Sequence, residues 1–157
     1  MKLGLAGVAL GLGFLAGAAE AQTVTDLKGN WLTREPADSG GTFVTLYTIA
    51  ALADRLTFRS VGVRLEDSPL GASAGSGTDF LFELAADGHE LSGTLLFRQT
   101  LRGLCEMPDL RIPVHGTIAA DWASVELRYD FPREEYDPCG WDKTMTTPTA
   151  VQFRRDR

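Results

Sequence analysis

The feature that most constrains this chain is the alternation of apolar and polar side chains that begins after Gly29. In residues 124–131, "SVELRYDF", every second side chain is apolar and falls on one face of an extended segment, namely Val125, Leu127, Tyr129 and Phe131. This pattern predicts strands with one buried and one solvated face. No stretch longer than about ten residues has the period of an amphipathic helix, so we expect an all-β fold.

Eight segments carry the pattern and predict strands over residues 29–34, 42–49, 55–65, 80–84, 91–97, 112–118, 124–131 and 150–155. Asp87-Gly88 is a typical hairpin turn, and a change of face near Ser60 predicts a β-bulge. Residues 49–54 could instead form a turn of helix. Two longer connections are expected, over residues 68–77 and 132–148. Eight strands joined in this way favour a barrel or a sandwich, and we expect an eight-stranded antiparallel up-and-down β-barrel.

The N-terminal segment has the organisation of a signal peptide. Lys2 precedes an apolar run from Leu3 to Ala19, and Ala19-Glu20-Ala21 offers the small residues that a signal peptidase recognises, so cleavage is expected before Gln22. An uncleaved membrane anchor is the alternative, because the run approaches the lower end of the ~17–25 residues that span a bilayer. The sequence therefore predicts a signal peptide over residues 1–21, a single domain over residues 22–157, and a periplasmic or secreted location.

The net charge of the chain is −6. Removal of the signal peptide takes away Lys2 and Glu20, so the charge of the mature chain does not change. An acidic chain without a basic run is poorly suited to nucleic acids or anionic membrane surfaces, because both attract clustered cations. We expect no nucleic-acid partner and no membrane insertion after cleavage.

Two cysteines, Cys105 and Cys139, predict one disulfide in an exported protein. A metal pair or a redox pair is the alternative, but neither cysteine has a second Cys or His at ligand spacing, and the two do not form a C-x-x-C motif. In an up-and-down barrel, the two connections that hold them emerge at the same end. The closed loop of about 35 residues corresponds to roughly 3–4 kcal/mol in the chain-entropy model.

Trp31 follows Gly29 and Asn30 at the start of the first strand. A large flat side chain beside a glycine can lie under the strands and close one end of a barrel, although it could also be an ordinary core residue. With Asp26-Leu27 ahead of it, Gly29-Asn30-Trp31 resembles the G-x-W segment of the lipocalin-like (calycin) barrels. Avidin-type barrels and small periplasmic metalloprotease inhibitors are similar in having G-x-W followed by eight strands.

The lipocalin resemblance implies an arginine of the last strand lying across the tryptophan ring in a cation–π contact. If Trp31 and Phe153 both point inward, strand parity selects Arg155 for this role, with Arg154 as the fallback. A barrel of eight strands is either filled by its own side chains or holds one small ligand. The residues that we expect to line such a ligand pocket are Trp31, Phe58, Phe80, Phe82, Phe97, Tyr129 and Phe131, and the same residues would serve equally well as core packing.

Other motifs favour simpler interpretations. Gly71-Ala72-Ser73-Ala74-Gly75 has the G-x-S-x-G pattern, but no helix follows it and the chain is too short for the hydrolase scaffold, so we interpret it as a loop. His89 and His115 are expected to be solvated. The four carboxylates near Cys139 could hold calcium, but they lack the alternating D-x-D-x-D pattern, so a solvated loop is expected; they are Glu134, Glu135, Asp137 and Asp142.

We therefore expect an exported, non-enzymatic β-barrel that binds a small apolar ligand or an envelope partner, with no catalytic residues, no metal and no cofactor. The alternative is a protein-binding module, such as a periplasmic protease inhibitor with a solid core, acting through its N-terminal tail or its long connections. An enzyme would need His89 or His115 beside a carboxylate in a cleft.

Overall fold

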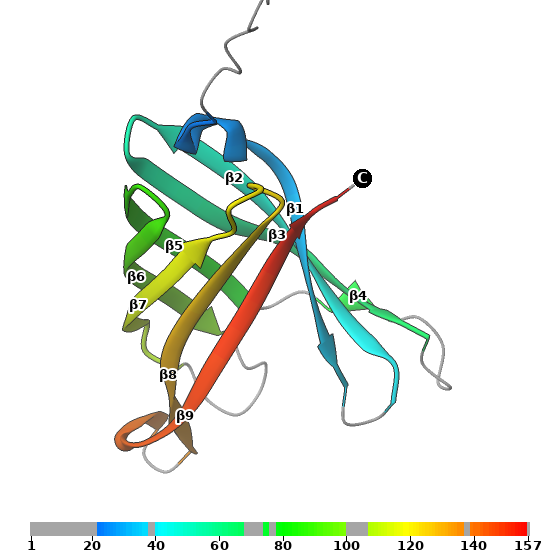
Figure 1. Cartoon of the computed structure of the whole chain (residues 1–157). Coiled ribbons are helices and arrows are strands. Elements are labelled where there is room, and N and C mark those ends of the chain that lie inside the picture. Colours follow the sequence, from blue (N-terminus) through cyan, green and yellow to red (C-terminus); the bar gives the residue numbers. More distant parts are fainter. Residues whose placement is uncertain are drawn as a thin grey trace, which may run out of the picture.

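The computed structural model describes residues 22–37, 40–67, 74–75, 78–99, 107–136 and 139–156. In these ranges a turn of 3-10 helix, η1 (Val24–Leu27), precedes nine β-strands (Figure 1). The strands are β1 (Gly29–Pro36), β2 (Thr42–Leu52), β3 (Arg55–Glu66), β4 (Ala74–Gly75), β5 (Thr78–Asp87), β6 (Glu90–Gln99), β7 (Leu110–Ile118), β8 (Ser124–Tyr136) and β9 (Cys139–Arg155). Residues 1–21 and Cys105 lie outside the described residues, so the signal peptide and the disulfide stay predictions.

The sheet closes on itself. Leaving aside the two-residue strand β4, which adds to β3, each strand pairs antiparallel with the next along the chain, and β9 pairs with β1. The predicted all-β fold with eight antiparallel barrel strands is thus confirmed. Consecutive pairing also puts the β6–β7 and β8–β9 connections at the same end, as expected from the sequence.

The two ends of the barrel differ. At the closed end, where β1 begins and β9 stops, η1 lies across the strands and Leu27 joins the core (Figure 1). At the open end, where β1 stops and β9 begins, two strand pairs diverge. β1 and β9 pair only at Trp31↔Arg155 and Leu32↔Arg154, and β7 pairs with β8 only over residues 115–118.

Each of the four diverging strands carries a proline in its diverging part. These are Pro36 in β1, Pro113 in β7, Pro132 in β8 and Pro148 in β9. Because proline has no N–H, none of these positions can donate a hydrogen bond to a neighbouring strand.

Two local predictions are settled by the strand register. The β-bulge near Ser60 is confirmed, because Tyr47 pairs with Ser60 while Leu46 pairs with Gly62, which leaves Val61 as the extra residue. The turn of helix considered for residues 49–54 does not form. Instead β2 continues to Leu52, and a two-residue turn at Ala53 and Asp54 leads into β3.

The long connection predicted over residues 132–148 is wrong. β8 and β9 continue as a hairpin to Tyr136 and Cys139, with a register shift between Pro132 and Arg133. Prolines and charges in this stretch suggested a loop, but its threonines favour extended structure because they are β-branched. Beyond the shift, Arg133 and Asp142 face each other across the hairpin and form an ion pair of 3.1 Å.

Candidate binding site at the open end of the barrel

The closed end is sealed by Trp31. The side chain is fully buried, and its indole Nε1 donates a 2.8 Å hydrogen bond to the carbonyl oxygen of Leu27 in η1. The Arg155 guanidinium carbon lies 5.3 Å from the centre of the Trp31 ring, and Arg155 also donates to the carbonyl oxygen of Asp26. Arg155 is the residue that strand parity selected for this cation–π contact.

The middle of the barrel is occupied by four aromatic side chains, each at most 4 % exposed. Phe153 lies at their centre. Its ring is 4.9 Å from Tyr47, 5.0 Å from Phe58 and 5.7 Å from Phe82, all in edge-to-face arrangements. Such contacts stabilise a core beyond the area that they bury. Three of the residues expected to line a ligand pocket, Trp31, Phe58 and Phe82, are therefore wholly buried against other side chains.

The other four residues expected in the pocket gather toward the open end, where Trp141 joins them. We call these five the open-end aromatic group: Phe80, Phe97, Tyr129, Phe131 and Trp141. Phe97 lies 5.0 Å from both Phe80 and Phe131 and 5.6 Å from Trp141. Phe97 is buried, but the other four are only partly buried. Aromatic surface at this end is therefore still available for contact.

Trp141 was not found by sequence reasoning. Its indole Nε1 donates a 2.8 Å hydrogen bond to the carbonyl oxygen of Pro108, and its ring is 5.7 Å from Phe131. The charged and proline-rich composition around it predicted a loop. The signal that could have revealed it is an isolated tryptophan in an otherwise polar stretch, since tryptophan is most often at least half buried.

Glu35 is a charged residue at the inward parity of β1, two positions beyond the buried Thr33 and four beyond Trp31. It stands opposite Phe43 of β2, which is 43 % exposed. The carboxylate keeps solvent contact, but partial burial raises its pKa. The sequence pattern predicts a first strand that ends at Arg34, but β1 continues to Pro36 and includes Glu35.

Two tyrosines interact with this carboxylate. Burial raises the pKa of Tyr47 and of Tyr129, and the charge of Glu35 raises both further, while a hydrogen bond with Thr33 lowers that of Tyr47. Tyr129 also lies 6.4 Å from Phe131. The charge of Glu35 thus acts on Tyr129 of the open-end aromatic group, and both hydroxyls stay protonated across the physiological range.

Within the described residues neither histidine makes a ring contact with the open-end aromatic group. His89 Nδ1 forms a 2.9 Å hydrogen bond with the carbonyl oxygen of Ile118, and its ring lies 5.0 Å from Trp122. His115 is exposed on the outer face of β7. Within the described ranges no ion pair joins either imidazole to a carboxylate. His115 lines a pocket of about 600 Å³ where β7 and β8 separate, and Tyr129 of the open-end aromatic group also lines this pocket.

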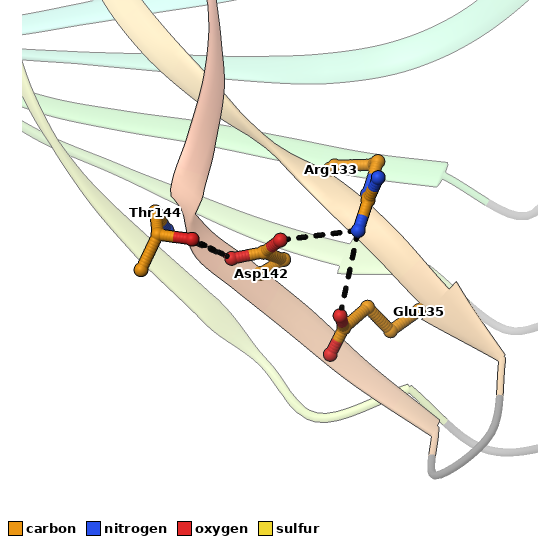
Figure 2. A network of polar contacts seen from close by, with 4 residues as sticks. All are labelled: Arg133, Glu135, Asp142 and Thr144. Carbon is orange, nitrogen blue, oxygen red and sulfur yellow. Dashed lines mark hydrogen bonds and ion pairs between the residues drawn. The ribbon is translucent and has the colours of Figure 1, made fainter.

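Two of the carboxylates near Cys139, those of Glu135 and Asp142, lie on the β8–β9 hairpin (Figure 2). Asp142 accepts hydrogen bonds from the Thr144 hydroxyl at 2.6 Å, from the Thr144 N–H at 2.9 Å and from Arg133 at 3.1 Å. These contacts lower the pKa of Asp142, the Thr144 hydroxyl contributing most. Glu135 lies 3.7 Å from Arg133. Among the described residues no group of three or more His, Cys, Asp and Glu side chains could hold a metal. Asp137 and Gly71 to Ser73 lie outside the described residues.

Comparisons of the chain with protein-family models, curated proteins and solved structures found no match. Within the described ranges, no helix has the length and apolarity that crossing a membrane requires. The arrangement of side chains at the open end therefore carries the functional argument.

Proposed function

We propose that this protein is an exported, non-enzymatic binding protein that takes a small ligand at the open end of its barrel. One observation carries the proposal. The barrel is sealed at one end and filled by aromatic rings in its middle, but at the other end aromatic side chains remain partly exposed, and Glu35 lies at the inward parity of β1 at the same end. Ligand sites commonly combine such apolar walls with a few polar groups that fix orientation.

The side chains at this end favour a ligand with two parts. A flat apolar body would pack on Phe131 and Trp141, and a cationic or hydrogen-bond-donating group would meet the Glu35 carboxylate. The hydroxyls of Tyr47 and Tyr129 can act as further donors or acceptors near the carboxylate. A positive charge beside Glu35 favours the ionised carboxylate, so binding of a cation should release a proton from the fraction of Glu35 that is protonated.

The three tryptophans allow a direct test. Trp31 lies at the sealed end, Trp122 in the β7–β8 turn and Trp141 at the open end, so their indole N–H signals in a ¹H–¹⁵N NMR spectrum report three separate places. We expect 2-naphthylmethylamine to shift the Trp141 signal and leave Trp31 unchanged. The matched anion, 2-naphthylacetate, should bind more weakly.

Glu35→Gln should remove the preference for the amine, whereas Glu83→Gln, an exposed position on β5, should not. Trp→Phe variants assign the three signals. Equal binding of amine and anion by the unmodified protein would refute the role of Glu35. No shift of Trp141 with either probe at millimolar concentration would refute the ligand site.

A protein-binding module is the second candidate, because the filled middle of the barrel matches the solid core that this alternative expects. Its proposed N-terminal tail is not free, however. Leu27 is fully buried, Val24 packs against the core, and the Asp26 carbonyl accepts from Arg155. We therefore expect removal of residues 22–25 to leave binding of any protein partner unchanged, and loss of binding on this trimming would favour the tail.

We also propose that Cys105 and Cys139 form a disulfide and that the barrel is lipocalin-like. The hydrogen bond between Trp141 and Pro108 supports the crosslink, because it joins a residue two positions after Cys139 to one three positions after Cys105. When the exported protein is treated with an alkylating reagent, its intact mass should increase by two alkyl groups only if the protein has first been reduced. Alkylation of the unreduced protein would refute the crosslink.

A further inference from the structure

A pocket of about 770 Å³ lies on the side of the closed end, separate from the open-end aromatic group. It is formed where η1, the β7–β8 turn and the end of β9 meet. We call it the closed-end pocket; its lining includes Asp26, Asp121, Trp122, Arg154 and Arg155.

Trp122 is held in an unusual conformation at this pocket. Its φ is +57°, in the left-handed region that glycine and asparagine adopt more readily and that is a genuine outlier for a bulky residue. The Trp122 N–H donates to the Ala119 carbonyl at 2.9 Å, and the Asp121 carboxylate accepts from the Ala123 N–H at 3.0 Å. With His89 against its ring, the partly exposed indole is a fixed aromatic surface. Residues held in this way are found frequently at functional sites.

The two carboxylates of the pocket are already engaged by backbone. Asp26 accepts from the N–H and the hydroxyl of Thr23 at the start of η1, and Asp121 accepts from Ala123. Within the described residues neither carboxylate forms an ion pair with Arg154 or Arg155.

The hydrogen-bond donors of the pocket are in excess. Arg154 bonds only the Gln152 side chain, through two of its five N–H groups, and Arg155 donates only to the Asp26 carbonyl within the described residues. The Trp122 indole N–H makes no hydrogen bond to the part of the chain that the structure describes. Two guanidinium groups and an indole with spare N–H groups favour a ligand with several acceptor oxygens and a negative charge.

We propose that the closed-end pocket is a second binding site, for a small ring-bearing carboxylate. The ring packs on Trp122 and the carboxylate is bound by Arg154 and Arg155. An aromatic acid and a sugar acid share this chemistry, because both present a ring face to the indole and a planar carboxylate to a guanidinium.

The test uses 4-hydroxybenzoate and D-glucuronate as the aromatic and sugar probes, each with its methyl ester as the uncharged control. We expect at least one acid to shift the Trp122 indole N–H signal while Trp31 and Trp141 stay in place. Its ester should bind at least tenfold more weakly. The acid that shifts the Trp122 signal shows whether the site accepts an aromatic acid or a sugar acid.

Arg154→Gln should lower affinity for the acid at least tenfold and leave the weak affinity for the ester unchanged. Arg111→Gln, an exposed arginine on β7, is the matched control and should have no effect. Trp122→Asn suits the left-handed backbone and should leave the melting temperature unchanged. It should no longer bind the acid, as measured by calorimetric titration because the Trp122 signal is absent. The proposal is overturned if acid and ester bind alike, if Arg154→Gln changes neither affinity, or if no acid shifts Trp122 at millimolar concentration. Because Trp141 reports the open end, failure here leaves the proposed function unaffected.

Discussion

Gly93 in β6 has no room for a side chain. It shares the inward parity of Leu91 and Leu95 in β6 and pairs with Leu84 of β5. A methyl group on its α-carbon would lie 2.1 Å from the Glu83 carbonyl oxygen and 2.9 Å from the Leu84 α-carbon. Ordinary contact begins at 3.4 Å, so the oxygen and the methyl group would have to separate by a further 1.3 Å or so.

This clash cannot be relieved by rotating a side chain, because both neighbouring atoms belong to the backbone of the paired strand β5. Gly93→Ala should therefore cost about 1–3 kcal/mol as overpacking. The smaller conformational entropy of alanine in the unfolded chain returns about 0.4–1 kcal/mol. We expect a net loss of about 1–2 kcal/mol in the free energy of unfolding.

Gly62→Ala is the matched control. Gly62 lies in β3, has no atom within 4 Å of the added methyl group and does not require the left-handed region. Its substitution should stabilise the protein by up to about 1 kcal/mol. Urea unfolding followed by circular dichroism measures both variants. If Gly93→Ala is as stable as Gly62→Ala, the close approach of β5 and β6 at this point is refuted.

Three further outcomes are expected. Trp31→Phe leaves the Leu27 carbonyl without its indole partner and should cost about 1–3 kcal/mol in urea unfolding, and unchanged stability would contradict the sealing role of Trp31. Because burial raises the pKa of Glu35 in the folded state above its ordinary value, the stability linked to its protonated form is complete below the unfolded pKa and is lost as the pH rises through the folded pKa. Glu35→Gln should therefore be more stable than the unmodified protein at pH 7 but not at pH 4 in thermal melts, by a small amount because solvent screens the exposed carboxylate. Cys139→Ser should have a free energy of unfolding roughly 3–4 kcal/mol lower than that of the oxidised protein and equal to that of the reduced protein. Equal stability of the unmodified protein before and after reduction would argue against the disulfide.

The strands of the closed end and the middle could be predicted because their two faces differ. Val125, Leu127 and Phe153 are fully buried, and the residues between them face solvent or are only partly covered. A period of two in the sequence follows directly from this asymmetry. The alternation of the last strand also selects Arg155 as the residue over Trp31, because Arg155 lies two positions after the inward-pointing Phe153.

The open end was harder to predict because its strands are not covered in the same way. From Lys143 to Pro148, β9 is exposed on both faces, so its side chains carry no alternation to detect. Pairing with β8 determines its conformation, and this is a tertiary effect that overrides local composition. Glu35 and Trp141 both lie in stretches whose composition predicts loops, so sequence reasoning does not identify either residue.

The four prolines at the diverging edges also affect how the molecule behaves among its own copies. An unpaired strand edge offers free backbone groups to any passing chain, and this is a common route to aggregation and amyloid. Pro36, Pro113, Pro132 and Pro148 each lack the N–H that such pairing uses, and natural sheets use proline at strand edges for this protection. We therefore expect the prolines to make association of two copies along these strand edges less favourable.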